Sequence, residues 1–252
     1  MAKQKGIIKL DGTIGGITFY KSTQDGYLAR EKGGVSADKI ANDPAFQRTR
    51  ENGEEFGRAG KAGKLLRNSI RAMLQNASDS RMVSRLTQKM VEVVQEDAVN
   101  PRGQRNVIDG EAELLEGFEF NISGKLGTTL YAPYTSTIDR VAGTLVVSIP
   151  AFVPLNMVAA PGGSTHFKIV SAGTEVDFEN ETFVVATSET AVLPWDTTAT
   201  AVINLSNAVT ANSVHPLFLA LGIEFYQEVN GQMYPLKNGA YNALALVKVD
   251  GN

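Results

Sequence analysis

The chain has 252 residues, of which 43% are hydrophobic and 20% charged, so disorder throughout is excluded and one large or two ordinary domains are expected. It contains no cysteine, which excludes disulfides, thiolate metal sites and cysteine nucleophiles. Residues 1–105 hold 19 Lys and Arg against 12 Asp and Glu, a net of +7, whereas residues 106–252 hold 5 against 15, a net of −10. This asymmetry favours two modules with different electrostatic partners, or one module that binds the other in a neighbouring copy.

The first ten residues, MAKQKGIIKL, contain no apolar run of the length that a secretion signal needs. No later run is long enough to span a bilayer. We therefore expect a chain without a membrane span that is cytoplasmic as synthesised. A place in a virion or an extracellular assembly would then be reached by a non-classical route.

Residues 6–34 predict a small β-meander of three strands, at 8–10, 13–21 and 27–32, with large apolar side chains on both faces. In the middle strand, alternation places Ile14 and Tyr20 on one face and Ile17 and Phe19 on the other. Both faces need a cover, and a sheet of this size provides none. The predicted assembly surface of the meander comprises Ile14, Ile17, Phe19, Tyr20 and Tyr27.

A helical region follows the meander, with Asp43 as N-cap and Pro44 as the first helical residue. Apolar residues at helical spacing, beginning with Phe56, predict one amphipathic helix over 56–77, and a second is predicted over 80–98. Glycines in the first helix each cost about 1 kcal/mol relative to alanine, so we expect another element to approach closely there. A helix break over 53–60 is the alternative. The predicted assembly surface therefore also includes Gly57, Gly60 and Gly63.

From residue 113 onward the pattern is almost entirely β. Short apolar runs separated by Gly- and Pro-containing turns predict an antiparallel sandwich of the immunoglobulin-like or fibronectin type III-like kind, including a hairpin at Asn230–Gly231. The fold class is thus α+β, with an assembly domain at 1–106 and a sandwich domain at 107–252. The expected strands are 114–122, 135–140, 144–149, 165–172, 182–187, 199–206, 217–229 and 243–249.

Two clusters of charge could carry chemistry. The segment GRAGKAGK approaches a phosphate-binding loop, but Arg58 and Leu65 stand where the motif needs glycine and Ser or Thr. The acidic stretches at 111–119 and 177–181 have no calcium-loop spacing, and neither histidine has a metal or triad context. We therefore expect no catalytic, metal or cofactor site and no enzymatic activity. A candidate polyanion-binding row, with a solvated helix face as the alternative, consists of Lys61, Lys64, Arg67 and Arg71.

The segment NDPAFQRTRENGEEFGRAGKAGKLLR contains the pattern R.R.N..EF..A, formed by Arg48, Arg50, Asn52, Glu55 and Phe56. With Gly-rich strands before it and a β-rich half after it, the chain resembles a family of uncharacterised proteins known from Bacteroidetes genomes. The resemblance covers most of the chain. It implies a bacterial or phage-derived context and no assigned chemistry.

Three hypotheses about function follow. The first is a non-enzymatic, self-assembling structural protein, such as a subunit of an oligomer, a filament or a phage-like particle, whose partner is itself or another structural subunit. The second is a binding module whose sandwich loops contact a protein or a carbohydrate. The third is an architectural nucleic-acid-binding protein that uses the basic helices. The first explains the most features: the uncovered meander, the glycine-lined helix and the charge asymmetry.

Overall fold

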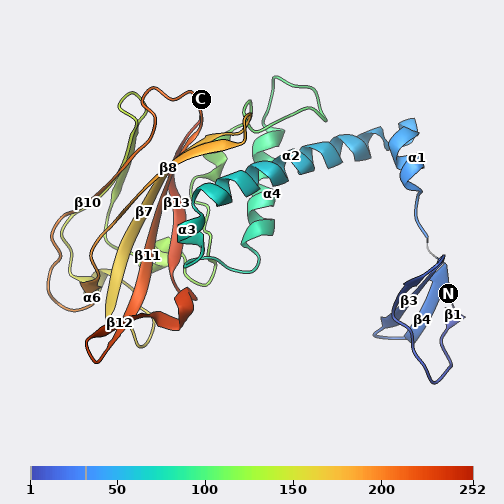
Figure 1. Ribbon diagram of the computed structural model, residues 1–252, viewed down its shortest axis with the longest axis horizontal. Coiled ribbons are helices and arrows are strands. Elements are labelled where there is room, and N and C mark those ends of the chain that lie inside the picture. The colour runs from blue at the N-terminus through green and yellow to red at the C-terminus, as the bar shows by residue number, and fades with distance from the viewer. Residues whose placement is uncertain (1, 32, 252) are drawn as a thin grey trace. The chain divides into compact units, whose positions relative to one another are not determined.

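The computed structural model describes residues 2–31 and 33–251, apart from the side chains of Lys237 and Asn238 (Figure 1). It combines helices with mostly antiparallel sheets, one of them curled like half a barrel, which confirms the predicted α+β class. The chain divides into two compact units, Met1–Arg50 and Glu51–Asn252, which we call the N-terminal unit and the C-terminal unit. In the described part of the chain, no helix is both long and apolar enough to cross a membrane.

The N-terminal unit contains a four-stranded sheet in the order β1-β4-β3-β2, so the predicted three-stranded meander is corrected in two places. Residues 8–10 lie outside the strands, and their predicted place is taken by Ala2–Lys3, which pairs with β4. The predicted middle strand is broken by a turn in which Gly15 has φ +58°, a conformation open to glycine. Lys32, the predicted end of the last strand, lies outside the described residues. The strands are β1 (Ala2–Lys3), β2 (Gly12–Ile14), β3 (Ile17–Ser22) and β4 (Gly26–Glu31).

Two short helices complete this unit. Helix α1 (Ala37–Asn42), which the sequence analysis did not include, is capped by Ser36, whose hydroxyl accepts a hydrogen bond from the Lys39 amide. The predicted helix start at Asp43 and Pro44 is confirmed, although the first turn is the 3₁₀ helix η1 (Pro44–Phe46). The carboxylate of Asp43 accepts a hydrogen bond from the Ala45 amide.

Three helices follow: α2 (Gln47–Ser69), α3 (Arg71–Leu74) and α4 (Met82–Gln95). The predicted helix over 56–77 is therefore longer at its start and interrupted near its end, because Ile70 leaves the helical region at φ −107° and ψ 24°. Most of its predicted apolar stripe is buried. Phe56 is the exception, since 60% of its surface is exposed.

The C-terminal unit confirms the predicted strands at 144–149 and 217–229 to the residue, as well as the hairpin at Asn230–Gly231. Residues 114–122 do not form the predicted strand, because the 3₁₀ helix η2 (Ala112–Leu115) and the positive φ of Gly117 precede a short segment that pairs with strand β13 (Ala243–Asp250). The strands are β5 (Thr135–Asp139), β6 (Thr144–Ile149), β7 (His166–Asp177), β8 (Thr182–Glu189), β9 (Leu193–Pro194), β10 (Ile203–Ala208), β11 (Leu217–Val229), β12 (Gln232–Pro235) and β13 (Ala243–Asp250). The short helices are η2 (Ala112–Leu115), α5 (Leu126–Thr129), α6 (Pro154–Met157) and η3 (Leu236–Gly239).

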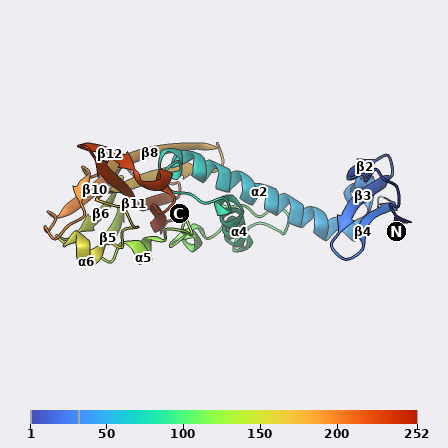
Figure 2. The ribbon, with the colours of Figure 1, turned by 90° about the horizontal axis from the view of Figure 1, so that it is seen from below.

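These strands form a three-stranded sheet, β10-β6-β5, and a six-stranded sheet in which β7 and β11 are central. The two faces of β11 bury different residues: Leu219 and Leu221 share a core with β6 and β10, whereas Phe218 and Ala220 share a core with α2 and α4. Figures 1 and 2 show α2 and α4 on one side of the large sheet and β10 on the other, with β6 labelled beside β10 in Figure 2. The centre of the large sheet is thus buried on both faces, whereas β8 and β12 at its edges are largely exposed.

This packing explains why the observed division differs from the predicted boundary at 106/107. Leu66 of α2 and Leu86 of α4 are fully buried in the same core as Leu244 of β13. Most of α2 and all of α4 therefore belong to the C-terminal unit, and only the small sheet, α1, η1 and the first residues of α2 form the N-terminal unit. The predicted boundary follows the change from a helical to a β pattern, which does not reveal this shared core.

Candidate assembly interface

The register of the N-terminal sheet decides which side chains share a face, because opposite residues in an antiparallel pair point to the same side. Ile14 lies opposite Ile17 across the two-residue turn, whereas Tyr20 lies opposite Leu28. The predicted grouping of Ile14 with Tyr20 is wrong, because the turn at residues 15–16 reverses the chain between Ile14 and Ile17. The other face carries Tyr20 and Leu28. One face, the apolar face below, carries Ala2, Ile14, Ile17, Phe19, Tyr27 and Ala29.

The apolar face is largely open to solvent. Ile14 exposes 63% of its surface and Ile17 exposes 46%, while Phe19 and Tyr27 are half-buried. Leu28, on the opposite face, is the only buried residue among the described positions 2–31 and 33–50. Burial of one leucine contributes about 2 kcal/mol, so the N-terminal unit has almost no core of its own.

Basic side chains surround the aromatic rings of this sheet. The ammonium groups of Lys9 and Lys21 lie 5.8 Å and 5.7 Å from the centre of the Tyr27 ring, and the guanidinium of Arg30 lies 5.3 Å from that of Tyr20. At these distances a cation is attracted to the face of the ring. The apolar face therefore has Lys9 and Lys21 beside Tyr27, whereas Arg30 and Tyr20 belong to the opposite face and Glu31 lies opposite Ile17.

Both edges of the sheet are open within the part of the chain that the structure describes. Strand β2 pairs with β3 alone and β1 with β4 alone, so each leaves one row of backbone groups for another strand. Beside them, the loop after β1 exposes Ile7 completely and Ile8 almost completely. The sequence analysis placed Ile8 in a strand, and only the tertiary pairing of β1 with β4 reveals it as a loop residue.

The three glycines predicted at the assembly surface lie on α2, in different surroundings. A Cβ at Gly57 or Gly60 would meet no atom within 4 Å, so no described element approaches them closely. Gly63 is buried against the side chains of Leu86 and Met90, which lie 3.6–3.7 Å from the position that a Cβ would take. The expected close approach therefore exists within the chain at Gly63 only, and at ordinary contact distance.

The candidate polyanion row lies on α2 and at the start of α3. Lys61, Lys64 and Arg71 are exposed, and Arg67 is half-buried with its Nε donating to the Gly63 carbonyl. None of the four forms an ion pair with any described residue. The structure thus places three of them along α2 and the fourth, Arg71, after the interruption at Ile70.

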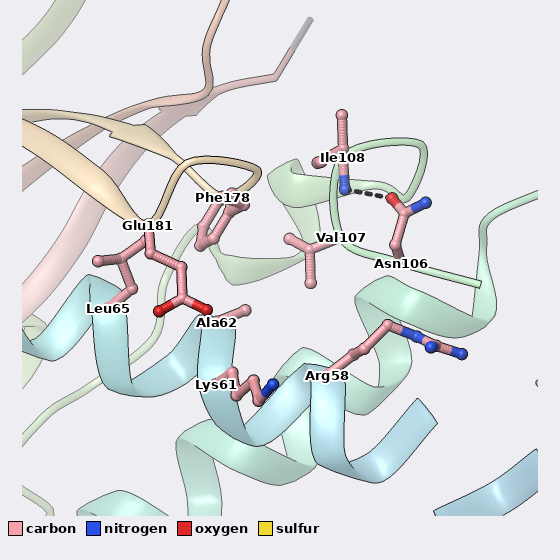
Figure 3. A pocket seen from close by; sticks show the side chains of 9 residues that line it. All are labelled: Arg58, Lys61, Ala62, Leu65, Asn106, Val107, Ile108, Phe178 and Glu181. Atoms are coloured by element: carbon pink, nitrogen blue, oxygen red, sulfur yellow. Dashed lines mark hydrogen bonds between the residues drawn. The ribbon is translucent and has the colours of Figure 1, made fainter. Parts of the chain in front are cut away.

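A hollow of about 200 Å³ lies beside Lys61 (Figure 3). Phe178, from the turn between β7 and β8, and Val107 face α2 across it, and Glu181 lies at its rim. The side chain of Arg58 is held by the carbonyls of Gly103 and Arg105. The walls are mostly apolar, and the arrangement does not resemble a phosphate-binding loop.

The pattern R.R.N..EF..A has a structural explanation. Arg50 donates to the carbonyls of Ile40 and Asp43, which fixes α1 and η1 against the start of α2. Asn52 accepts a hydrogen bond from Arg102, and Glu55 accepts one from the Gly103 amide. Three of the five residues in the pattern therefore hold neighbouring segments to the helix.

Glu55 is the residue of this pattern whose role sequence reasoning missed. Its carboxylate is 3% exposed and accepts hydrogen bonds from the Gly103 amide at 2.8 Å and from the Arg105 guanidinium at 2.8 and 3.0 Å. The hydrogen bond from Arg105 lowers the pKa of Glu55 below its usual value, although burial opposes this. The signal available in the sequence was the helical spacing that places Glu55 four residues before Ala59, an alanine on the apolar side of the helix.

Within the described residues, no group of three or more His, Asp or Glu side chains could hold a metal ion. Of the predicted assembly residues, the structure brings Ile14, Ile17, Phe19 and Tyr27 together on one face and places Tyr20 on the other. The glycines lie on a helix of the other unit. Comparison with known proteins found no match to this chain among family models, curated proteins or solved structures.

Proposed function

We propose that this protein is a non-enzymatic structural protein that assembles with copies of itself, and that the N-terminal unit is its contact element. The observation that carries this proposal is the exposed pair Ile14 and Ile17 in a unit whose only buried described residue is Leu28. A sheet of this size gains independent stability when its apolar face packs against another surface. A second copy supplies such a surface once the protein concentration is high enough for two copies to associate.

The charges of the two units support contact between copies. The N-terminal unit carries 9 Lys and Arg against 5 Asp and Glu, a net of +4, and the C-terminal unit carries 15 against 22, a net of −7. Opposite charges steer two partners together and disfavour contacts between like units. A contact between the N-terminal unit of one copy and the C-terminal unit of another therefore has favourable electrostatics.

The energy of the two isoleucines sets a lower bound on the interface. Full burial of an isoleucine contributes about 1.5–3 kcal/mol, so burying what Ile14 and Ile17 still expose contributes about 2–3 kcal/mol together. Association costs at least about 4 kcal/mol in lost translational and rotational freedom. The interface must therefore include more than these two side chains, and Phe19, Tyr27 and the open strand edges are the nearest additional groups.

Four further points belong to this proposal. The two sheets of the C-terminal unit form an immunoglobulin-like or fibronectin type III-like sandwich, which is supported by the core shared between β11 and strands β6 and β10. The chain is a bacterial or phage-derived subunit, in agreement with the resemblance described above. It is made in the cytoplasm. It reaches a virion or an extracellular assembly by a non-classical route.

The mass of the protein across a concentration series tests the proposal. Sedimentation velocity of the full chain should give a mass that rises above the 27.0 kDa of one chain, and the double variant Ile14→Lys, Ile17→Lys should stay at one chain. Val141→Lys is the matched control, because Val141 is an exposed apolar residue of the C-terminal unit. A wild-type protein that remains monomeric throughout would refute self-assembly.

Nucleic-acid binding is the second candidate, favoured by the exposed Lys61, Lys64 and Arg71, which form no ion pair with described residues. Phosphate contacts release counterions, so such binding weakens steeply with salt. The variant Lys61→Glu, Lys64→Glu should lose DNA binding measured by fluorescence anisotropy at low salt. Wild-type protein that shows no anisotropy change with duplex or single-stranded DNA would exclude this function.

A further inference from the structure

The edge strand β8 of the C-terminal unit is unprotected. It pairs with β7 alone among the described strands, and the other side of its backbone has no strand partner. Phe183, Val184 and Val185 are exposed by 40%, 44% and 39%, although successive side chains of a strand point to opposite faces. Both faces of this end of β8 are therefore partly open to solvent, and β10 lies close to β8 without pairing with it.

Edge strands of natural sheets are normally blocked by charges, by proline or by a covering segment. Strand β8 ends in Glu189, which pairs with Lys168 of β7 at 2.9 Å, but its stretch from Thr182 to Thr187, TFVVAT, has neither a charge nor a proline. The opposite edge of the same sheet shows the usual protection: β12 ends in Pro235, β13 contains Lys248 and Asp250, and residues 117–120 bond to the β13 backbone. The contrast indicates that β8 is left open for a partner.

The surroundings of β8 are acidic. The turn that leads into it carries Glu179 and Glu181, and β7 places Glu175 and Asp177 next to it. The backbone amide and the side chain of Asn180 both donate hydrogen bonds to the Asp177 carboxylate. These two hydrogen bonds, the one from the amide most of all, lower the pKa of Asp177. His215, 3.7 Å from Asp177, and Lys61, across the hollow from Glu181, are basic residues near these carboxylates, and Lys168 of β7 pairs with Glu189 at the other end of β8. The partner that fits is therefore an apolar strand edge with basic flanks.

We propose that the open edge of β8 in one copy is the docking site for the N-terminal sheet of a second copy. The N-terminal sheet has the open edge of β2 and the exposed Ile14 and Ile17. Its basic side chains Lys9 and Lys21 lie beside Tyr27, farther along the sheet. The inference rests on the proposed function and names the acceptor surface that the proposed function leaves open.

Such a contact joins two different surfaces, so each copy has one free donor and one free acceptor. Repetition gives a closed ring if the rotation between copies closes, or an open filament if it does not. Strand addition at an edge forms backbone hydrogen bonds in addition to the burial of side chains. These backbone hydrogen bonds add to the interaction energy, which Ile14 and Ile17 alone do not supply in the amount that association needs.

A mixing experiment tests this inference. The donor variant is Ile14→Lys, Ile17→Lys, and the acceptor variant is Phe183→Lys, Val185→Lys. Each variant alone should sediment as a single chain, with an association constant reduced by about tenfold or more. An equimolar mixture should form a complex with twice the mass of one chain and nothing larger, because the only intact donor and the only intact acceptor then lie on different copies.

The possible outcomes separate the two proposals. An acceptor variant that assembles like wild type, with only the donor variant monomeric, overturns the role of β8 and leaves self-assembly standing. A wild-type protein that stays monomeric overturns both, including the case in which the N-terminal sheet covers β8 of its own chain. If the acceptor variant does not fold by circular dichroism, Phe183→Thr, Val185→Thr replaces it, because threonine keeps the strand preference and removes most of the apolar surface.

Discussion

Glu55 and Phe56 are neighbours on α2, and their substitution tests the structure against the simplest interpretation of the sequence. The helical pattern predicts that Phe56 packs in the core and that Glu55 is a solvent residue. In the structure Phe56 is 60% exposed, whereas Glu55 is buried and accepts three hydrogen bonds from the loop that follows α4. The expected order of the two effects on stability is therefore reversed.

The magnitude for Glu55→Ala follows from its partners. The Gly103 amide loses its acceptor, and an unpaired buried donor costs about 1–3 kcal/mol. The Arg105 side chain loses a bidentate partner but is 20% exposed, so water recovers part of that interaction. We expect a loss of about 3 kcal/mol in the free energy of unfolding. Phe56→Ala, which removes a side chain that is less than half buried, should cost at most about 1 kcal/mol.

Urea unfolding followed by tryptophan fluorescence is the assay. Trp195 is the only tryptophan and packs against the core of the C-terminal unit, so the signal reports the unit that contains Glu55. The midpoint should fall clearly for Glu55→Ala and little for Phe56→Ala, with an unchanged slope. Equal losses, or a larger loss for Phe56→Ala, would refute the buried contact between Glu55 and the loop.

Three further predictions concern glycine, acid and alkali. Gly57→Ala and Gly60→Ala should each raise the free energy of unfolding by about 1 kcal/mol, since an added Cβ meets no atom within 4 Å. Gly110→Ala should lower the free energy of unfolding, because its Cβ would lie 2.4 Å from the Val93 carbonyl oxygen. The midpoints of urea unfolding measure both effects. Because the pKa of Glu55 is lowered in the folded state, its stabilisation is complete above the usual value of 4.5 and is lost as the pH falls through the folded pKa. Wild type should therefore lose more stability than Glu55→Gln as the pH falls below about 4.5, and parallel curves for the two proteins would contradict this assignment. Burial, followed by the hydrogen bond to Glu224, raises the pKa of Tyr226 to about 12, so a tyrosinate absorbance titration should show a late step that Tyr226→Phe removes.

Strands with strict alternation or long apolar runs could be predicted from the sequence. The β6 segment TLVVSI and the β11 segment LFLALGIEFYQEV are bounded by turn residues, and both are found as predicted. The Asn230–Gly231 turn specifies its hairpin by local chemistry. These elements depend on short-range preferences that agree with the tertiary packing.

Elements that depend on distant partners could not be predicted. Ala2–Lys3 is a strand only because β4 lies beside it, and Gly15–Gly16 turns the chain although the flanking residues alternate as one strand. Phe56 and Glu55 exchange their expected roles because the partner of Glu55, Arg105, is fifty residues away in sequence. At the candidate interface, the apolar residues could be listed from sequence, but their shared face required the register.

Hydrogen exchange of the β2, β3 and β4 amides, compared between dilute and concentrated protein, tests the central proposal most directly. The N-terminal unit buries only Leu28 among its described residues, so on its own it should open easily and exchange fast. If copies dock through this sheet, protection at residues 12–22 should rise with protein concentration while the core amides of β11 stay unchanged. Protection that is the same at both concentrations would contradict assembly through the N-terminal sheet.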